Sequence, residues 1–474
     1  MQVHKGRQLA TRNKTSASTS SPRGRAPKEE ARPAQTPLPT RAELAAAFSQ
    51  ALDLAEGREP GHAARVCYIA ANLADAIEAS EKDRRAVYYG ALLHDSGAAP
   101  ASAEICREHN LGEDALFATN PGQSPQQRGL EIAPFNAAAV VEVLRAHVDE
   151  SAIIAKHLGF DVSVQHAIAA HHERWDGRGY PKALKGKAIA LSGRIVGAAD
   201  LIESLISAEQ NTLAARRNLM AGMAEQAGNA IDPGLADAAR ELVRSDEFWL
   251  GLHSSAEPRE LSVLAEDDSE PTMKDVTTFG AVFAGLADGK GEHRKGHSEQ
   301  TAAVAEELAS ALGMPAERRE LLRLAGLIYD VGLLGVPARV MAKPDILSLA
   351  EMESMRKHPS FSQKILEGLT GMTELAQWVG AHHERPDGRG YPEMLDEKAI
   401  PIEARILAIA DTYVALTSVR PYRRALSRDD ALQVLLGGAG TQHDPKLVKT
   451  FFTRGVGAKP AKSSRTARRS PRTR

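Results

Sequence analysis

Apolar residues recur every three to four positions through most of this chain. Val66, Ile69, Leu73 and Ile77 form one such series. This spacing places their side chains on one face of an α-helix. No segment shows the sustained alternation of apolar and polar residues that a half-buried β-strand requires. The pattern therefore predicts an all-α protein.

Composition agrees with this fold class. Hydrophobic residues make up 43% of the 474 residues but aromatic residues only 4%, and alanine is abundant throughout. Such a mixture favours helices that pack through small and aliphatic side chains over β-sandwiches, which are rich in aromatic and β-branched residues. The length allows two or three domains, each with its own core.

The chain contains an internal duplication. The sequence HHERWDGRGYP at 171–181 returns as HHERPDGRGYP at 382–392, and three intervals between flanking landmarks, of 32, 24 and 28 residues, are also repeated. The 32-residue interval separates His62 from His94 and also His297 from Tyr329. The 24-residue interval separates His147 from His171 and His358 from His382. The 28-residue interval separates His172 from Asp200 and His383 from Asp411. Self-similarity of this kind predicts two copies of one structural unit in series.

One interval differs between the copies. His94 and His147 are 53 residues apart, whereas Tyr329 and His358 are 29 apart. The first copy therefore carries an insertion, which we expect to form a loop in the Gly-, Asn- and Pro-rich stretch 108–130. The predicted divisions are a disordered basic tail (1–40), the first copy (41–250), a linker (251–274), the second copy (275–454) and a second disordered basic tail (455–474).

The net charge of −2 conceals two basic tails on an acidic body. Residues 1–40 hold eight Lys and Arg against two Glu, residues 459–474 hold seven and no acid, and the remainder holds 44 basic and 59 acidic residues. Both tails lack apolar periodicity, which predicts disorder. They also lack aromatic residues for stacking on bases, which argues against nucleic-acid binding and favours solubilising extensions.

Cysteine usage and hydropathy indicate a cytoplasmic protein. Cys67 and Cys106 cannot build a disulfide framework, and we interpret both as small buried apolar residues. No apolar run approaches the roughly 20 residues that a membrane-spanning helix needs. We expect no secretory signal, because no hydrophobic stretch follows the charged N-terminus.

The first copy holds a set of side chains suited to first-row metals such as Fe or Mn. The set comprises His62, His94, Asp95, His147, His171, His172 and Asp200. A single one of these histidines would be interpreted as a packing or surface residue, but seven side chains in register with a second copy favour a metal site. Two divalent ions about 3.5–4 Å apart can bind a phosphodiester and lower the pKa of a bridging water.

These motifs resemble a known family. His94–Asp95, followed by H-H-E-x-x-D-G-x-G-Y-P and then Asp200, closely resembles the HD-GYP subgroup of the HD metal-dependent phosphohydrolases, over nearly all of 60–245 and 295–452. The resemblance implies an all-α fold, a di- or trinuclear iron or manganese site and hydrolysis of cyclic di-GMP. It also implies that the seven side chains above are metal ligands. The loops around Tyr180 and Tyr391 would then lie near the substrate and contact partner signalling proteins.

The second copy departs from this pattern at the HD histidine, where Tyr329 precedes Asp330. A neutral phenol is a poor ligand near pH 7, since its unperturbed pKa is about 10. A single metal still has candidate ligands in this copy. They are His297, Asp330, His358, His382, His383 and Asp411.

The first copy lacks a different feature. Beyond Asp411 the second copy carries Arg420 and Arg423, which resemble the family's phosphate-binding element, but the same offsets from Asp200 give Glu209 and Thr212. Arg216 and Arg217 lie further along, where a solvated helix face is the favoured interpretation. Both copies also lack the lysine that the family places after the HD motif, since Ala98 and Leu333 occupy that position.

The leading hypothesis is a cyclic di-GMP phosphodiesterase with two Fe or Mn ions in the first copy. Asp95 would bridge the ions and, with His94, take part in catalysis, while the second copy would be regulatory or would bind nucleotide through Arg420 and Arg423. One alternative is a general metal-dependent nucleotide phosphohydrolase, and another is an inactive signalling scaffold. Oligomeric state, including a homo-oligomer, is left open.

Overall fold

The computed structural model describes residues 37–458, apart from residues 59, 110, 112, 118–124, 135, 208–211, 255–257, 266–269 and 421–422. The two predicted disordered tails lie almost wholly outside the described residues. Within the described part of the chain, helices alternate with turns, and β-structure is limited to isolated bridges. The all-α prediction is confirmed. None of the described helices is long and apolar enough to cross a membrane.

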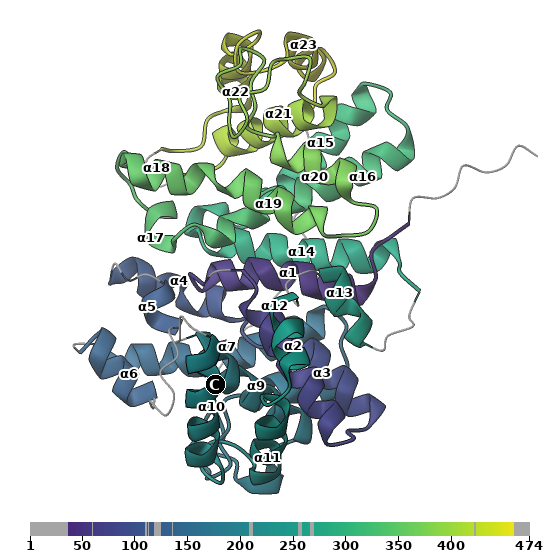
Figure 1. The fold of residues 1–474 in the computed structure, drawn as a ribbon. Helices are drawn as coiled ribbons and strands as arrows, with labels where there is room; N and C mark the ends of the chain where they lie inside the picture. The colour runs from purple at the N-terminus through teal and green to yellow at the C-terminus, as the bar shows by residue number, and fades with distance from the viewer. Residues whose placement is uncertain are drawn as a thin grey trace, which may run out of the picture. The chain divides into compact units, whose positions relative to one another are not determined.

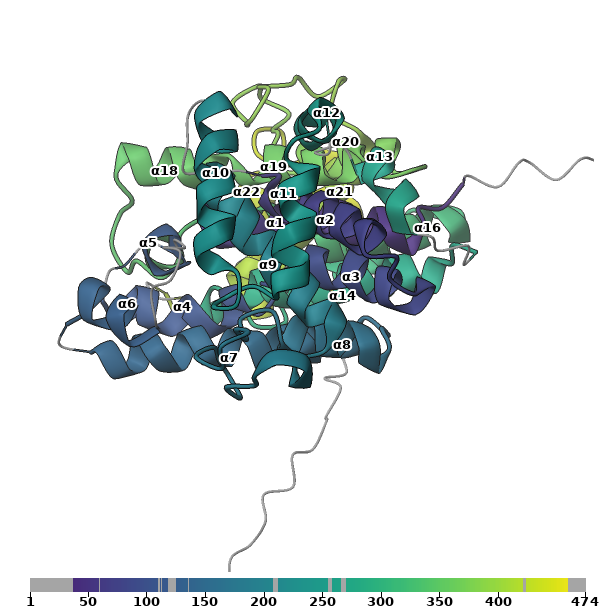
Figure 2. The ribbon, with the colours of Figure 1, turned by 60° about the horizontal axis from the view of Figure 1, so that its bottom comes forward.

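The first copy and the segment after it are built from helices throughout (Figure 1). Their bounds are α1 (Arg41–Ala55), α2 (His62–Ala76), α3 (Glu81–Leu93), α4 (Ala98–Glu108), α5 (Glu113–Phe117), α6 (Pro125–Ile132), α7 (Ala137–His157), α8 (Val162–Ala169), η1 (Gly186–Ala188), α9 (Leu191–Ser207), α10 (Thr212–Gln226), α11 (Pro233–Leu242), α12 (Asp246–Ser254), α13 (Pro258–Ser262) and η2 (Val263–Ala265). The segment predicted as a linker therefore includes short helical turns. Helices α10 and α11 lie side by side (Figure 2).

The second copy repeats much of this order. Its helices are α14 (Met273–Gly289), η3 (Glu292–Arg294), α15 (His297–Ala311), α16 (Ala316–Ile328), η4 (Val331–Gly335), α17 (Ala338–Met341), α18 (Leu349–Arg356), α19 (His358–Glu367), α20 (Thr373–Gly380), α21 (Ile402–Thr417), α22 (Arg428–Gly437) and α23 (Pro445–Thr453).

Each copy starts a helix at its first predicted ligand, His62 or His297, and a glycine in the left-handed conformation precedes both helices. Gly61 precedes α2 with φ of 110°, and Gly296 precedes α15 with φ of 75°. Glycine adopts this left-handed conformation without the steric cost that a Cβ imposes. In the first copy the Asp53 carboxylate accepts hydrogen bonds from the Gly61 and Ala63 amides, at 2.6 and 3.0 Å, and so fixes the start of α2.

The two copies share a hydrophobic core. One cluster of buried residues contains side chains of both copies. Helices α1 and α14, the first helix of each copy, lie side by side (Figure 1), and the rings of Phe48 and Phe283 stack with centroids 4.3 Å apart. Phe279 of α14 also meets Phe160 of the first copy edge-on at 6.2 Å. The duplicated units therefore stabilise each other through apolar contact.

The insertion in the first copy is more ordered than the sequence predicts. Its described part contains α5 and α6 instead of a continuous loop. The expectation of a loop was wrong because burial against other elements stabilises these short helices: Leu116 and Ile132 join a small apolar cluster with Ile105 of α4 and Ala338 of the second copy. Tertiary packing of this kind leaves little trace in local composition.

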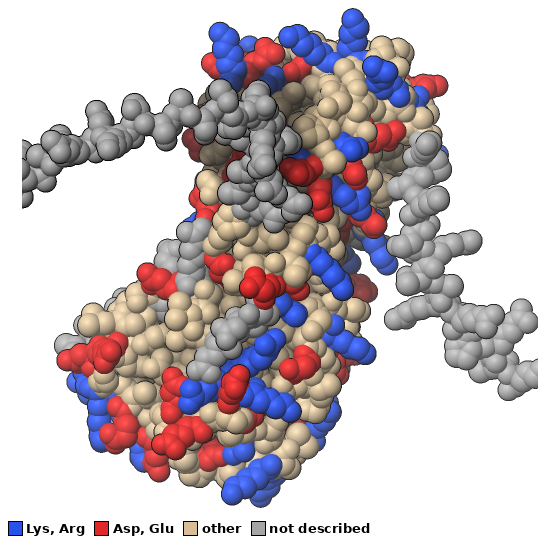
Figure 3. Space-filling view, turned by 90° about the vertical axis from the view of Figure 1, so that its right-hand side faces the viewer, with Lys and Arg blue, Asp and Glu red and all other residues tan. Residues whose placement is uncertain are grey.

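Charged side chains on the surface are mixed in sign. On the face shown in Figure 3, Lys and Arg alternate with Asp and Glu over the drawn residues.

Candidate metal centre

A glycine brings the HD motif against α7. His94 is the C-cap of α3, Asp95 follows it, and Gly97 precedes α4. A Cβ at Gly97 would lie 2.3 Å from the His147 carbonyl oxygen, and the Gly97 amide donates to Ser151 Oγ at 2.8 Å. Only glycine allows this approach, which places Asp95 beside His147. The second copy repeats the contact at Gly332.

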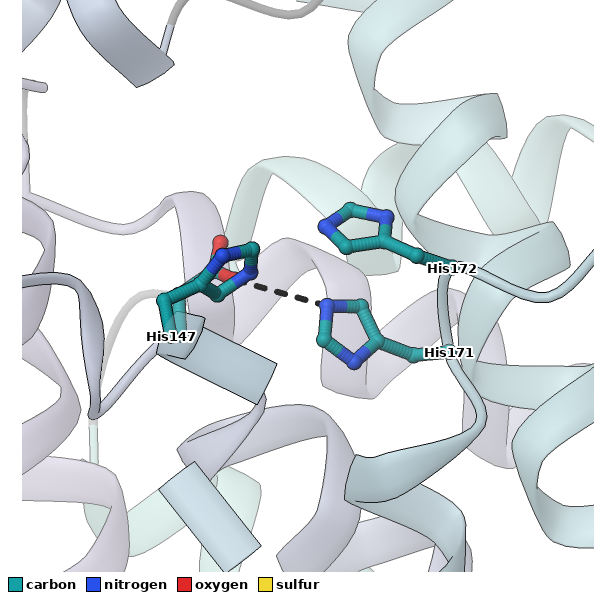
Figure 4. Close-up of side chains that lie close together, drawn as sticks. His147, His171 and His172 are labelled. Carbon is teal, nitrogen blue, oxygen red and sulfur yellow. Dashed lines mark ion pairs between the residues drawn. The ribbon is translucent and has the colours of Figure 1, made fainter. Parts of the chain in front are cut away.

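The seven predicted ligands of the first copy come together as two adjacent groups. In each group, one donor atom per residue lies within 4.8 Å of the others. One group is His62, His94 and Asp200, and the other is Asp95, His147, His171 and His172. Figure 4 shows His147 facing His171 and His172, with rings of the latter two 4.0 Å apart. Each of the two groups could hold a metal ion.

Asp95 lies between the two groups. Its Oδ2 is 3.0 Å from His94 Nε2, while its Oδ1 is 3.4 Å from His147 Nε2 and 3.5 Å from His171 Nε2. Each carboxylate oxygen therefore faces a different group of ligands. A carboxylate oriented in this way can bridge two ions.

Hydrogen bonds orient the imidazole rings. The Nδ1 atoms of His94 and His171 donate to the Ala91 and Ile168 carbonyl oxygens at 2.7 and 2.6 Å. In His62 the same atom meets Glu203 Oε2 at 2.7 Å. Because these partners occupy Nδ1, the Nε2 atoms face the centre. Outer contacts of this type are a regular feature of histidine metal ligands.

Burial and neighbouring charges shift the pKa values of the predicted ligands. Burial alone would lower the pKa of His94, but the adjacent Asp95 carboxylate outweighs it and raises this pKa to about 10. The His94 cation in turn holds the pKa of Asp95 well below its usual range against the effect of burial. Burial lowers the pKa of His171 and His172, so both rings stay neutral. Binding a metal at His94 must therefore release a proton.

The donor set fits divalent metal ions. Nε2 of His171 and Oδ1 of Asp200 are buried without a hydrogen bond of good geometry among the described residues. Buried polar atoms are rarely left unsatisfied unless an unseen ligand, water or ion pairs with them. Imidazole nitrogens and carboxylate oxygens together suit first-row transition metals. The residues present thus match a metal-dependent centre.

The GYP loop forms one wall of the centre. The Tyr180 amide donates to the His172 carbonyl oxygen at 3.1 Å, and the two rings lie 4.7 Å apart. Glu173 holds the loop, because its carboxylate accepts from the amides of Lys182 and Leu184 at 2.7 and 2.8 Å. The second copy repeats the loop, with Tyr391 beside His383 at 4.8 Å.

The predicted ligands of the second copy also lie close together in two groups. One group is His358, His382 and His383, and the other is His297, Asp330 and Asp411. Here, however, the donor atoms satisfy each other. The Tyr329 hydroxyl donates to Asp411 Oδ1 at 2.9 Å and lies 2.9 Å from His297 Nε2. Tyr329 therefore occupies hydrogen-bonding positions that a metal would need.

An arginine of the second copy also pairs with one of the predicted ligands. The Arg294 guanidinium pairs with Asp330 Oδ2, leaving Oδ1 toward His358 at 3.1 Å. The equivalent oxygen of the first copy, Asp95 Oδ2, faces His94. Burial alone would lower the pKa of Arg294, but the charge of Asp330 outweighs this effect and raises that pKa above its ordinary value. A buried cation thus neutralises the carboxylate that would bridge two metals.

The first copy also contains an arginine near its ligands. Arg58 contacts His62 Nε2 and forms an ion pair with the buried Glu56 at 2.9 Å. A metal bound to His62 Nε2 requires this guanidinium to move, and Glu56 is a partner that can retain it. The Arg58 charge also interacts with Asp95, less strongly than with Glu56.

The predicted phosphate-binding arginines are placed differently from one another. Arg420 lies 3.5 Å from His297 Nδ1. Arg423 instead donates to the carbonyl oxygens of Ala415 and Leu416 at the end of α21, both at 2.9 Å. In the first copy Arg216 pairs with Asp246 at 2.9 Å. Glu209 lies outside the described residues.

Sequence reasoning missed Glu203, Arg58 and Arg294. Glu203 follows Asp200 by one helical turn, a spacing that places both on one face of α9 and was therefore available as a signal. Arg58 precedes His62 by four residues, and Arg294 precedes His297 by three. Their side chains reach the sites through irregular turns, for which the sequence offers no periodicity.

Comparison with known proteins identifies relatives over both copies. The HD domain family model matches residues 138–235 and 281–447. The 3′3′-cGAMP-specific phosphodiesterase 3 of Vibrio cholerae serotype O1 is 30% identical over 433 residues, which are 85% of this chain and 92% of that protein. The cyclic di-GMP phosphodiesterase response regulator RpfG of Xanthomonas campestris is 39% identical, over 32% of this chain and 41% of its own length.

A solved structure shares the arrangement. The crystal structure of a cyclic GMP-AMP-specific phosphodiesterase of V. cholerae superposes with a TM-score of 0.64 at 26% identity and covers 88% of this chain and 97% of that one. Together with the paired His and Asp clusters and the two GYP loops, these matches show that the chain belongs to the HD domain family, as a metal-dependent phosphohydrolase of the HD-GYP type.

Proposed function

We propose that this protein is a phosphodiesterase that hydrolyses a cyclic dinucleotide at a dinuclear metal centre in the first copy. The observation that carries the proposal is the position of Asp95, whose two carboxylate oxygens face separate groups of ligands. The second copy has the same fold but pairs its equivalent carboxylate with Arg294. Relatives that span both copies are phosphodiesterases of cyclic dinucleotides.

The protein's own residues prepare the centre for this chemistry. Two divalent ions supply Lewis acidity and a water of lowered pKa. Asp95 would hold the ions together with His94, His147 and His171, whose side chains are almost completely buried. Glu203 holds the His62 ring by its Nδ1 atom. Tyr180 closes the side next to His172, where it excludes water and limits how a dinucleotide can approach.

Two substrates are candidates. Cyclic di-GMP follows from the resemblance of the motifs and from relatives that match about a third of the chain. 3′3′-cGAMP is favoured by relatives that match 85% and 82% of the chain and are named as specific for it. Because these longer matches include both copies, we infer that 3′3′-cGAMP is the better substrate.

The second copy would then act as a regulatory or nucleotide-binding partner. Its ligands satisfy one another through Tyr329 and Arg294, which favours a structural role for the cluster over hydrolysis. Nothing in this arrangement prevents binding of a nucleotide elsewhere in the copy.

The test is turnover by anaerobically purified protein loaded with Mn²⁺ or Fe²⁺. Rates are compared for 3′3′-cGAMP, cyclic di-GMP, a linear dinucleotide and a nucleoside monophosphate at equal concentration. We expect hydrolysis of both cyclic compounds, faster for 3′3′-cGAMP. Hydrolysis of linear compounds alone would indicate a general nucleotide phosphohydrolase. Metal-loaded protein that cleaves none of them would indicate a signalling scaffold.

A further inference from the structure

The segment between α1 and α2 carries an arginine whose head group reaches the candidate metal centre of the first copy. Arg58 contacts His62 Nε2, and its side chain is 18% exposed. Burial alone would lower the pKa of Arg58, but four carboxylates outweigh burial and raise that pKa. They are those of Glu56, Asp95, Asp200 and Glu203. The guanidinium therefore stays charged beside the ligands, with part of its surface open to a molecule from solvent.

Two nitrogens of this guanidinium have different neighbours. Nε forms the ion pair with Glu56 Oε2 at 2.9 Å, and Glu56 is 1% exposed. Nη1 lies against His62 Nε2. Because His62 directs its Nδ1 atom to Glu203, Nε2 carries the lone pair that a metal ion would use. Metal binding would therefore end the contact at Nη1 and leave the ion pair at Nε in place.

Metal binding would also change the charges that the guanidinium has to balance. Without metal ions, Arg58 is a cation among carboxylates that include Asp95 and Asp200. Divalent ions are the largest local charges in a site and would neutralise these two ligands themselves. The N–H groups released from His62 would then be available to an anion. Guanidinium groups bind phosphate oxygens through such N–H groups, in a planar fork.

The first copy lacks basic side chains at the positions where the family resemblance expects them. Ala98 stands in place of the lysine, and Thr212 stands in place of one of the phosphate-binding arginines. Arg216, one helical turn further on, pairs with Asp246 at 2.9 Å. A cyclic dinucleotide nevertheless carries a negative charge at each phosphodiester. Arg58 is a cation that lies where this charge has to be bound.

The second copy differs from the first at the residue that holds Arg58. Asp53 and Asp288 are equivalent, since each accepts a hydrogen bond of 3.0 Å from the amide ten residues further along the chain. Three residues after Asp53 stands Glu56, but three residues after Asp288 stands Gly291. The second copy therefore has no carboxylate at the position of Glu56.

The arginine of the second copy is correspondingly placed on the carboxylate that would bridge two metals. Arg294 pairs with Asp330 there. In the first copy, Arg58 pairs with Glu56 and interacts less strongly with Asp95. This difference indicates that Glu56 retains the guanidinium beside the bridging carboxylate instead of on it.

We propose that Arg58 is a phosphate-binding residue of the first copy, whose guanidinium, anchored by Glu56, contacts a non-bridging oxygen of the substrate's phosphodiester when the metal centre is loaded. This inference rests on the proposed hydrolytic function. It names a substrate contact at a position that the family resemblance does not assign. Its effect is on binding of the substrate, and it adds no step to the chemistry.

Equilibrium binding of a slowly hydrolysed analogue tests this contact. The probe is the bisphosphorothioate analogue of 3′3′-cGAMP, titrated into Mn²⁺-loaded, full-length protein. The variant combines Arg58→Met with Glu56→Gln, because a buried carboxylate left without its cation would destabilise the fold. We expect this double variant to bind the analogue at least tenfold more weakly than the wild type. Arg58→Lys keeps the charge but loses the fork, so its affinity should lie between the two.

Metal affinity, measured by competition with a chelator, separates a phosphate contact from a structural role. The double variant removes the side chain that competes for His62 Nε2, so it should bind Mn²⁺ at least as tightly as the wild type. Glu56→Gln alone should instead lower the affinity for Mn²⁺ by about tenfold or more, because Arg58 is then free to pair with Asp95. A side chain that only stabilised the fold would not change the two affinities in opposite directions.

Arg216→Ala is the matched control. This arginine of α10 pairs with Asp246, so its loss should leave the affinities for the analogue and for Mn²⁺ unchanged. Melting temperature verifies the folding of each variant. Weaker binding of the analogue by Arg216→Ala, with unchanged binding by the double variant, would place the phosphate on α10 and overturn the proposal.

Two further outcomes would overturn the role of Arg58. Unchanged affinity of the double variant for the analogue would reduce Arg58 to a side chain that contacts His62 and no substrate. A joint loss of Mn²⁺ and of the analogue would mean that Arg58 acts through the metal ligands. Wild-type protein that holds Mn²⁺ but does not bind the analogue would contradict the proposed function itself, and the role of Arg58 with it.

Discussion

A single side-chain difference between equivalent positions separates the two copies chemically. His94 offers Nε2 to a metal, whereas Tyr329 uses its hydroxyl to link His297 and Asp411. Burial first, and then Asp330, raises the pKa of Tyr329 well above its usual value, so the phenol stays neutral. Arg294 then supplies the positive charge that balances Asp330. These contacts give the second cluster hydrogen-bond and ion-pair partners of its own.

Reversing these differences should restore metal binding in the second copy. We expect Tyr329→His combined with Arg294→Ala to raise the metal content by at least one ion per chain over the wild type, because both occupants of the site are removed. Elemental analysis of dialysed protein measures this content. The single variant Tyr329→His is the control and should gain less, since Arg294 still holds Asp330. An unchanged metal content in the double variant would contradict this view.

We expect Glu203 to affect metal affinity only by positioning the His62 ring. Replacing it in Glu203→Gln weakens the contact with His62 Nδ1, and loss of such an outer partner lowers metal affinity about 10–100-fold. Competition with a chelator measures the affinity. Glu225→Gln, an exposed glutamate of α10, is the matched control. Equal affinity in both variants would show that Glu203 does not position the ligand.

At the scale of elements, the position of each ligand depends on tight contacts between helices. The repeated histidine intervals predict correctly that the ligands converge, because the same helical unit occurs twice. The sequence could not predict the contacts that close the second site, since Arg294 reaches Asp330 through an irregular turn. It also missed α5 and α6, which pack in a cluster that includes Ala338 of the second copy, distant in the sequence.

Gly97 offers a test at this scale. In Gly97→Ala the new Cβ meets the backbone of α7, 2.3 Å from the His147 carbonyl oxygen, so α4 or α7 must shift. Overpacking of this kind costs about 1–3 kcal/mol, and displacement of Asp95 should also lower the metal content of the first copy. Chemical denaturation and elemental analysis provide the two readouts.

The matched control is Gly285→Ala in α14, where a Cβ would meet nothing within 4 Å. Alanine is favoured over glycine in a helix by about 1 kcal/mol, so this variant should be neutral or more stable. Equal destabilisation by the two changes would argue that Gly97 has no special role.

At the scale of the whole molecule, the copies are joined by a buried ion pair as well as by the common core. Lys290 of the second copy is 1% exposed and contacts Glu113 of the first copy at 3.1 Å and the Leu334 carbonyl oxygen at 2.6 Å. Glu113 also accepts from the Ala338 amide at 2.9 Å. Burial lowers the pKa of Lys290, and Glu113 opposes this effect. The inserted segment is thus tied to the second copy.

Breaking the pair from one side should be costly. Lys290→Ala leaves the Glu113 carboxylate buried without its cation, and such changes destabilise proteins by about 3–5 kcal/mol. The double variant Lys290→Met with Glu113→Gln keeps an acceptor for Ala338 and should recover most of this loss. Urea denaturation of the metal-free proteins measures both. A double variant as unstable as Lys290→Ala would show that the pair itself is needed.

We propose that hydrolysis takes place in the first copy. Turnover of 3′3′-cGAMP by Asp95→Asn and by Asp330→Asn, the equivalent change in the second copy, tests it most directly. We predict that Asp95→Asn abolishes turnover and that Asp330→Asn retains most of it. Turnover that survives in Asp95→Asn and disappears in Asp330→Asn would place the chemistry in the second copy and contradict the account.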